Sequence, residues 1–358
     1  MNLDDLATQP GEWLRGDGPL SEIVISSRIR LARNLVGFPF LGKATATQRR
    51  ELQRILRDRI KTLKVDDDVF YVEIDRSEEL DRQLLVERHL ISRQHAEGDG
   101  SRGVAVSGRE TVALMVNEED HLRIQVIRSG LQLDEAWQDI NHIDDAIEED
   151  VEYAFHEQYG YLTACLTNVG TGIRVSVMLH LPALKLTGEL ERVFRAAKDM
   201  RLAIRGLHGE GTEATGDFYQ VSNQITLGRS EEEIIDDFKN GVIPKIIEYE
   251  TRARDLLVRE KSSALDDRIF RALGALENAR TVSSEETLFL LSHVRMGVNL
   301  GRLDSVDLKT VNDLFLMTQP AHLQKLRGER LTGEERSIAR AEYIRQRLAG
   351  GGNNNNNN

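Results

Sequence analysis

The chain has 358 residues, of which 40% are hydrophobic and 30% are charged, a composition typical of a globular protein with a full core. Its net charge of −12 argues against direct binding to nucleic acid, because a phosphate backbone would meet a surface of the same sign. A single cysteine excludes an internal disulfide framework. Neither a signal-like segment nor an apolar run of bilayer length stands out, so we expect a cytoplasmic protein that does not contact the membrane.

The first two hundred residues mix runs of strand length with runs whose apolar residues have helical spacing. In chain order we expect a helix at 47–63, a strand at 69–74, a helix at 75–91, strands at 111–116 and 122–127, a helix at 131–159, a strand at 173–180 and a helix at 184–200. Side chains alternate between the two faces of a strand, so Arg123 and Arg174 are both expected on a polar sheet face.

The pattern changes to a largely helical one after Ser230. Capping boxes at 230–233, 283–286 and 332–335 predict helix starts, and no strand is expected beyond Leu227. We therefore expect a mixed domain at 1–255 and an all-helical domain at 256–350, with a long helix able to cross the boundary. The asparagine-rich residues 351–358 form a low-complexity tail that is expected to be disordered.

Four short stretches, 26–30, 117–123, 165–174 and 205–213, combine arginines with acidic residues. Their arginines supply enough planar guanidinium donors to grip a triphosphate. These are Arg28, Arg30, Arg123, Arg174 and Arg205. Glu119 and Glu210 could hold a cationic acceptor beside the triphosphate, so the set is typical of a phosphotransfer site. Taken alone, each arginine is more often a solvated surface group, Cys165 a small buried hydrophobe, and His121 a packed side chain.

Together the four stretches resemble the catalytic domain of the phosphagen (guanidino) kinases. The motifs Ser-Ser-Arg-x-Arg, Asn-Glu-Glu-Asp-His-x-Arg, Cys-x-Thr-Asn-x-Gly-Thr-x-x-Arg and Arg-Gly-x-x-Gly-Glu-x-Thr-Glu occur in this order within 21–229. The resemblance implies an α+β fold, with a glutamine-synthetase-like antiparallel sheet flanked by helices and followed by the helical C-terminal domain. It also implies that ATP and Mg²⁺ bind across the sheet, with the metal held through ATP and not by protein ligands of its own.

Carried over by position, the resemblance implies an ATP site made of residues from five segments. These are Ser26, Ser27, Arg28, Ile29 and Arg30, then His89, Arg123, Arg174, Val175, Ser176, Val177, Met178, Arg205, Gly206, Leu207, His208, Gly209 and Glu210. Glu119 and Glu210 would be the catalytic carboxylates that hold the substrate guanidinium, with the Cys165 thiol next to it. A guanidinium is not a nucleophile until it loses a proton, so a carboxylate is needed to accept that proton.

Two departures bear on the substrate. The small-molecule kinases carry a helical domain before their first arginine motif, whereas about twenty residues precede Ser21 here, so a more open acceptor site is expected. Leu166 and Gly211 also stand where those enzymes have proline and often histidine. These features and the run 205–214 resemble the bacterial protein-arginine kinases, as does the helical C-terminal domain.

That resemblance implies phosphorylation of accessible arginines in proteins, which marks them for a Clp protease and inactivates a heat-shock repressor. It also implies a zinc-binding activator, a Clp ATPase and the repressor as partners. The run 336–341 resembles a phosphoarginine-sensing motif, with Ser337 in place of its aspartate, and serine offers no bidentate acceptor to a guanidinium. The residues of this run are Arg336, Ser337, Ile338, Ala339, Arg340 and Ala341. Apolar faces at 288–291 and 314–317 make a homo-oligomer, a dimer or larger, the expected state.

Two alternatives stay open from the sequence. One is a kinase of free arginine or another small guanidine, and the other is an inactive adaptor that binds clients and nucleotide without transfer.

Overall fold

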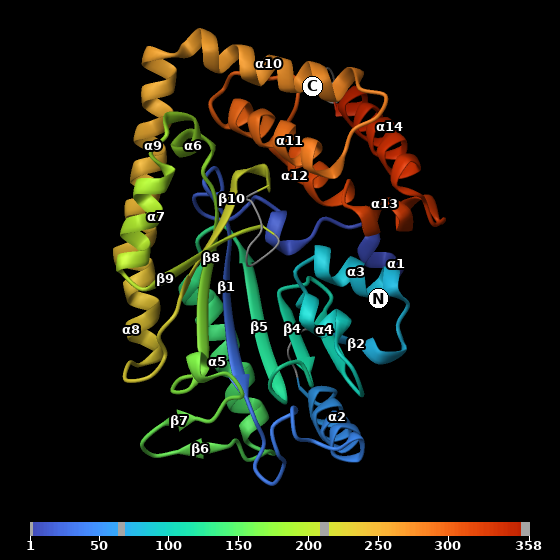
Figure 1. The fold of residues 1–358 in the computed structure, drawn as a ribbon, viewed down its shortest axis with the longest axis vertical. Coiled ribbons are helices and arrows are strands. Elements are labelled where there is room, and N and C mark those ends of the chain that lie inside the picture. The colour runs from blue at the N-terminus through green and yellow to red at the C-terminus, as the bar shows by residue number, and fades with distance from the viewer. Residues whose placement is uncertain (1–2, 64–68, 208–214, 352–358) are drawn as a thin grey trace, which may run out of the picture.

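The computed structural model describes residues 3–63, 69–207 and 215–351. At the centre of this part of the chain lies an eight-stranded antiparallel sheet with the order β2-β3-β4-β5-β1-β8-β10-β9 (Figure 1). Its strands are β1 (Val24–Arg33), β2 (Val69–Glu73), β3 (Gly103–Ser107), β4 (Val112–Val116), β5 (Leu122–Ser129), β8 (Ile173–His180), β9 (Leu202–Gly206) and β10 (Phe218–Asn223). A small hairpin of β6 (Phe155–His156) and β7 (Gly160–Tyr161) stands apart from the sheet.

Helices accompany the sheet and then form the C-terminal part. The helices of the first part are α1 (Leu3–Ala7), α2 (Ala46–Ile60), α3 (Glu79–Glu87), α4 (Arg93–Glu97), α5 (Leu133–Glu148), α6 (Pro182–Thr187), α7 (Leu190–Asp199) and α8 (Glu231–Asp236). A π-helical segment (Asp237–Val242) leads into α9 (Ile243–Glu260), which is followed by α10 (Ser262–Asn278), α11 (Ser284–Asn299), α12 (Leu308–Met317), α13 (Pro320–Arg327) and α14 (Gly333–Gly351). Short 3-10 turns are η1 (Glu12–Leu14), η2 (Ile74–Arg76), η3 (Leu166–Asn168) and η4 (Thr215–Asp217).

The α+β architecture expected from the sequence is confirmed, but three predicted helices have clearly different bounds in the structure. The helix expected at 131–159 ends at Glu148, because the chain turns there so that Tyr153 enters the core and bridges Leu35. The helix expected at 184–200 is two helices, because Gly188 adopts a left-handed conformation with φ 79° and ends α6. The helix expected at 75–91 starts only at Glu79, after the turn η2.

The two faces of the sheet have different coverings. Amphipathic α5 packs against β1 and β5, where Ile29 and Ile124 are fully buried. On the other face, α3 and α4 contribute to an apolar cluster that contains Val104 and Met115, above β3 and β4. Met115 pairs with Arg123 across the neighbouring strands, so the arginine belongs to that same face. The helices α3 and α4 thus cover one end of this face, and polar side chains occupy its middle.

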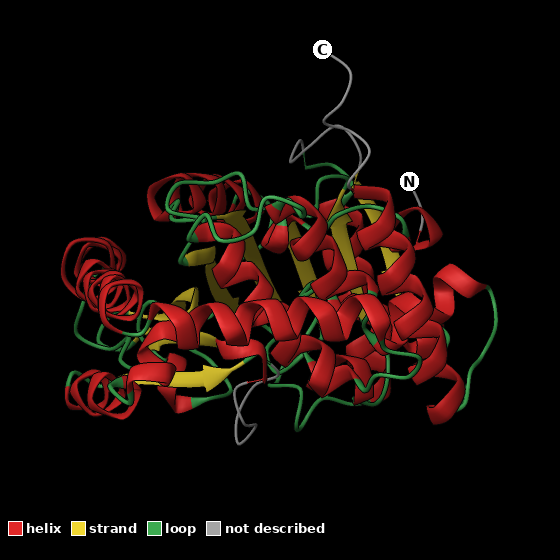
Figure 2. Ribbon diagram, turned by 90° about the horizontal axis from the view of Figure 1, so that it is seen from above, coloured by secondary structure: helices red, strands yellow, loops and turns green. Residues whose placement is uncertain are grey.

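The helices of the C-terminal part gather at the end of the sheet where β8 finishes (Figure 1). Seen from above, these helices lie over the sheet (Figure 2). The predicted boundary at 255–256 falls inside the single helix α9, and every helix from α10 to α14 lies beyond it. The predicted tail 351–358 lies outside the described residues apart from Gly351, the last residue of α14.

Buried hydrogen bonds connect the helical part to the end of the sheet. The Arg295 guanidinium of α11 donates to the backbone carbonyls of Ser21 at 2.6 Å and Glu22 at 3.1 Å and contacts His180 Nδ1 at 3.0 Å. His180 Nε2 contacts the Ser292 hydroxyl at 2.9 Å, and that hydroxyl donates to Asp217 at 2.7 Å. A continuous chain of hydrogen bonds therefore joins α11 to the end of β8 and to η4.

Glu87 of α3 makes a second attachment. Its carboxylate accepts the backbone N–H groups of Ala321 and His322 at 2.8 and 3.1 Å, and so caps the start of α13. The His322 ring lies between Glu87, at 2.7 Å, and Arg88, at 3.0 Å.

Candidate functional site

The strand register brings the predicted arginines onto one face of the sheet. Arg30 of β1 pairs with Arg174 of β8, and Arg205 of β9 pairs with Gln220 of β10. Arg123 of β5 lies opposite Ala32, two residues along β1 from Arg30. Residues that the sequence separates by more than a hundred positions therefore become neighbours, because β1 sits between β5 and β8.

A cavity of about 830 Å³ opens on this face. The residues around it come from β1, from the turn between β4 and β5, and from the segments that flank β8, β9 and β10. They include Arg30, Ser92, Glu118, Glu119, Arg123, Cys165, Thr167, Asn168, Arg174, Arg201, Arg205, Gln224 and Ile225. The cavity thus joins four of the five predicted arginines to one of the two predicted carboxylates and to the cysteine.

The fifth arginine, Arg28, lies on the same face of β1, two residues before Arg30, and is not among the residues described around this cavity. Its guanidinium contacts Gln220 and, at 3.4 Å, the Ser176 hydroxyl. Desolvation and the positive charges of Arg123, Arg174 and Arg205 lower its pKa to about 10. Desolvation and the neighbouring arginines likewise hold the pKa of Arg30 well below its usual value, and Arg30 Nε has no hydrogen-bond partner among the described residues. These positively charged groups repel one another, and Arg30 Nε is a hydrogen-bond donor that is not used within the described residues. Such a group of cations is suited to bind a polyanion.

The acidic turn between β4 and β5 holds two different carboxylates. Glu118 pairs with Arg123 at 2.9 Å and accepts from the Ser92 hydroxyl at 2.5 Å. Although burial opposes it, these partners lower the pKa of Glu118, so this side chain is a fixed anion. Glu119 lies 3.1 Å from Arg123, but burial raises its pKa above the usual value. A half-buried carboxylate with a raised pKa is the better proton acceptor of the two.

The neighbours of these carboxylates are structural, as the sequence suggested. Asp120 is buried and accepts hydrogen bonds from Asn34 at 2.7 Å and from the backbone N–H of Ala164 at 2.6 Å. His121 is buried and accepts the backbone N–H of Leu35 at 3.0 Å. Asp120 thereby ties the Glu119 turn to the segment that carries Cys165.

The Cys165 segment forms the open side of the cavity. Cys165 is half-buried, and its Sγ lies 3.0 Å from the Thr167 hydroxyl. The next residue, Leu166, is 85% exposed. The side chains of Ala164 and Thr167 are also exposed. A large ligand could therefore approach Cys165 and Glu119 from solvent.

The structure corrects part of the predicted ATP site. The side chains of Ile29, Val175 and Val177 point to the opposite face and are fully buried in the core under α5, because neighbours in a strand alternate between faces. Ser27 is on that face too, where its hydroxyl donates to the Gly130 carbonyl at 2.8 Å. Ser26, Ser176 and Met178 do reach the polar face beside Arg28. Gly206 and Leu207 are buried at the end of β9, and the predicted residues His208, Gly209 and Glu210 lie outside the described residues.

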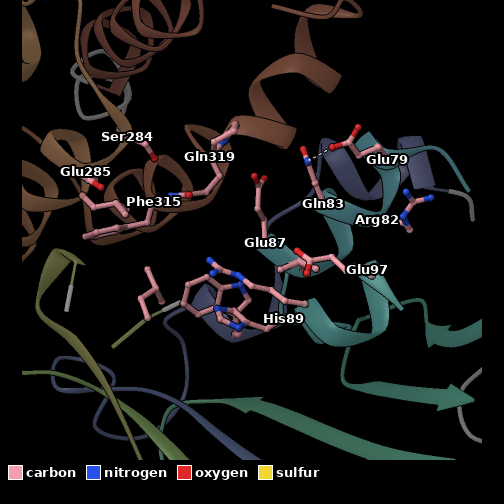
Figure 3. Close-up of a pocket in the computed structure, with 17 residues that line it drawn as sticks. Glu79, Arg82, Gln83, Glu87, His89, Glu97, Ser284, Glu285, Phe315 and Gln319 are labelled. Atoms are coloured by element: carbon pink, nitrogen blue, oxygen red, sulfur yellow. Dashed lines mark hydrogen bonds between the residues drawn. The ribbon is translucent and has the colours of Figure 1, made fainter. Parts of the chain in front are cut away.

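His89 lies at the other end of the polar face. It lines a small hollow with Arg28, Ser176 and Gln220, and its ring stands edge-on to Trp13 with centroids 4.4 Å apart. Trp13 and His89 also form the floor of a second pocket, of about 560 Å³, between α3–α4 and the helical part. Figure 3 shows Glu87, Gln83 and Glu97 on one side of this pocket, Phe315 and Gln319 on the other, and His89 below them.

Several residues of these cavities were not predicted from the sequence. Among them are Trp13, Gln220 and Arg201. Gln220 was detectable, since it alternates with buried Tyr219 and Val221 and so belongs to the polar face. Trp13 and Arg201 stand in no motif, and only the fold brings them to the site.

The predicted sensing run 336–341 lies on α14, away from the arginine cavity. Arg340 is 2% exposed and donates to the carbonyls of Thr318 at 2.8 Å and Val282 at 3.0 Å. Arg340 is therefore not part of an exposed helix face. Arg336 donates to the Leu331 carbonyl at 2.7 Å, and the Ser337 hydroxyl donates to the Gly333 carbonyl at 3.0 Å. Ile338 is exposed, whereas Ala339 and Ala341 are buried.

No group of three or more histidine, cysteine, aspartate or glutamate side chains within 3–63, 69–207 and 215–351 is placed to hold a metal ion. No helix in the same residues is long and apolar enough to cross a bilayer.

The chain is similar to known proteins over nearly its whole length. Residues 51–253 match the model of the ATP:guanido phosphotransferase C-terminal catalytic domain, and residues 262–358 match that of the protein-arginine kinase McsB C-terminal domain. A protein-arginine kinase of Halothermothrix orenii is 45% identical over 350 residues, which is 97% of this chain and 99% of that protein. A protein-arginine kinase of Symbiobacterium thermophilum is 46% identical over 353 residues, which is 98% and 100% of the two chains.

Solved structures are similar over 70% of this chain. The duplicated taurocyamine kinase from Schistosoma mansoni, with bound transition-state-analogue components, has a TM-score of 0.60 and 28% identity over 70% of this chain and 36% of that one. A lombricine kinase has a TM-score of 0.58 and 27% identity over 70% of each chain.

Proposed function

The chain belongs to the ATP:guanido phosphotransferase family, within its protein-arginine kinase branch, and on this premise we propose that it transfers the terminal phosphoryl group of ATP to arginine side chains of proteins. The observation that carries the proposal is the cavity that brings Arg30, Arg123, Arg174 and Arg205 together with Glu119 and Cys165. Cations there would hold the polyphosphate, and an anion beside them would hold a cationic acceptor.

Each group has one task in this proposal. Arg28, Arg30, Arg174 and Arg205 bind the phosphates and stabilise the charge that develops on the transferred group. Arg123 does the same while its pairing with Glu118 fixes its position. The nucleotide base lies toward Trp13 and His89, at the end of the face that opens into the second pocket.

Glu119 orients the acceptor guanidinium and accepts its proton as the new N–P bond forms. Its raised pKa suits that role, because a carboxylate that holds a proton more readily is a stronger base. The Cys165 thiol lies beside the guanidinium and tunes its charge. Glu210 is proposed as the second carboxylate from the sequence motif alone. Mg²⁺ would be held through the ATP phosphates, where it would neutralise charge on them.

A protein acceptor is favoured over free arginine by the open side of the cavity. Leu166 is 85% exposed, and the exposed side chains of Thr167, Arg201 and Gln224 follow the same edge. A polypeptide could rest along this edge while one arginine enters the cavity. A location in the cytoplasm, a zinc-binding activator, a Clp ATPase, a heat-shock repressor and a homo-oligomeric state remain predictions from the resemblance.

The test is incubation with magnesium ATP and either an arginine-rich protein or free arginine. Acid-labile phosphate on the protein is the expected product, and transfer to free arginine alone would support the small-guanidine kinase instead. Glu119→Gln is expected to lower kcat by about 10²- to 10⁴-fold. An unchanged rate in Glu119→Gln would contradict the role given to Glu119, and no transfer by the wild type to either acceptor would favour the inactive adaptor.

A further inference from the structure

Arg201 is an arginine of the cavity to which neither the motifs nor the proposed mechanism assigns a role. It lies between α7 and β9, directly before Leu202, and lines the cavity together with Glu119, Cys165 and Arg174. Its side chain is exposed, in contrast to the half-buried Arg30, Arg174 and Arg205. Among the residues that the structure describes, its guanidinium has no hydrogen bond or ion pair.

The backbone at Arg201 is unusual for an arginine. The residue follows the C-cap Met200 of α7, its N–H donates to the Lys198 carbonyl at 2.9 Å, and its φ is +57°. Glycine is the usual residue at this left-handed position after a helix, because a Cβ is disfavoured there. An arginine that occupies such a position at the mouth of a polar cavity is a candidate for a functional role.

The register places Arg201 on the acceptor side of the cavity. Leu202 pairs with Asn223, so the next step along the two strands puts Arg201 beside Gln224. Gln224 and Ile225 line the cavity with the Cys165 segment, whose Leu166 is the exposed residue at the edge. The guanidiniums assigned to phosphate lie deeper, on the strands themselves. Arg201 therefore lies on the side of the cavity where a polypeptide acceptor would rest, and not among the arginines that are assigned to the phosphates.

Charge identifies the chemistry of its partner. An acceptor arginine brings a positive charge to the side of the cavity where Arg201 lies, and Arg201 is the one arginine of the described lining that is not assigned to the ATP phosphates. A carboxylate on the residue next to the acceptor would reduce that repulsion and give Arg201 a partner. We propose that Arg201 binds an aspartate or glutamate side chain that neighbours the acceptor arginine, so that the enzyme prefers arginines with an acidic neighbour. This inference rests on the proposed function.

The experiment uses two peptides that differ only by Asp or Asn beside a single arginine, and compares their kcat/KM with the full-length protein. We expect the wild type to prefer the Asp peptide by about fivefold, the size of one exposed ion pair, and to lose the preference as salt is raised. Arg201→Gly should bring the ratio close to one. Glycine is favoured at this φ, so this variant should fold. Arg201→Lys should keep part of the preference.

Arg192→Ala is the matched control, because Arg192 is an exposed arginine of the same helix region outside the cavity. It should keep the wild-type ratio. An Asp-to-Asn ratio that is the same in Arg201→Gly and the wild type would overturn the inference while leaving the proposed function intact. The same holds for a rise in KM for ATP without a change in that ratio, since Arg201 would then face the nucleotide. If the wild type phosphorylates no peptide arginine, the proposed function fails, and this inference fails with it.

Discussion

Arginines in two regions of this protein are treated in opposite ways by their surroundings. At the junction with the helical part, Arg88 pairs with Glu110, Arg254 pairs with Glu250 at 2.8 Å, and Arg295 donates to backbone carbonyls. On the polar face of the sheet, Arg28 and Arg30 are surrounded mainly by other arginines, and desolvation together with these positive charges lowers their pKa values. At the junction, buried arginines have carboxylate or carbonyl partners that stabilise the fold. On the polar face, arginines outnumber the acidic side chains around them, and this is where an anionic ligand is proposed to bind.

The largest effect is expected when one arginine of the cavity loses its positive charge. Arg30→Met should lower kcat by about 10³-fold or more, because a guanidinium that stabilises the transferred phosphoryl group is lost. Its melting temperature should stay the same or rise, since the change removes repulsion from Arg28, Arg123 and Arg174. Rate assays and calorimetry on one preparation measure both effects. A variant that is strongly destabilised would show that the excess charge had structural partners.

The same substitution at the junction should have the opposite outcome. Arg295→Met should destabilise the protein by about 3–5 kcal/mol, because it leaves the carbonyls of Ser21 and Glu22 and the His180 ring without their buried donor. Denaturant unfolding measures this. Arg271→Met is the matched control, since Arg271 is an exposed arginine paired only with Asp267. Equal stability of Arg295→Met and Arg271→Met would contradict the structural role of the junction.

A smaller effect concerns pH at the same junction. Burial lowers the pKa of His322 below its ordinary value of 6.5, so the folded state takes up a proton less readily than the unfolded state does. The lowered pKa of His322 therefore adds to the stability of the folded state above about pH 6.5, and this added stability is lost as the pH falls below that value.

His322→Gln removes this group while an amide can still donate to Glu87 and accept from Arg88. The loss of stability between about pH 7.5 and 5.5 should shrink by about 1 kcal/mol in this variant. His142→Gln, a change at an exposed histidine of α5, is the control. An identical pH dependence in His322→Gln and the wild type would rule out the titration of His322 as a cause.

The sequence predicted the sheet better than it predicted the helix ends. Apolar runs of strand length identified β2, β4 and β5, and alternation along β5 and β8 placed Arg123 and Arg174 on the polar face. The helix predicted at 131–159 from its apolar spacing was too long, because α5 ends at Glu148. The chain beyond it turns so that Tyr153 bridges Leu35, a tertiary contact that the spacing does not show. Strands β3, β9 and β10 were among those that were not predicted.

Prediction of the site had a different limit. Motif order gave the arginines and Glu119, but a motif does not say which side chains of a strand face the ligand. Ile29 and Val175 therefore entered the predicted ATP site although their side chains are in the core. Trp13 and Arg201 reach the cavities through packing and register alone.

Calorimetric titration of magnesium ATP into the wild type, Arg30→Met and Arg295→Met tests the central comparison most directly. Arg30→Met should bind at least tenfold more weakly than the wild type, because a charge-assisted hydrogen bond to phosphate is worth about 1.5–3 kcal/mol. Arg295→Met, at a temperature where it is folded, should bind as the wild type does. Equal affinity of Arg30→Met and the wild type would contradict the claim that the excess arginines of this face form the phosphate site.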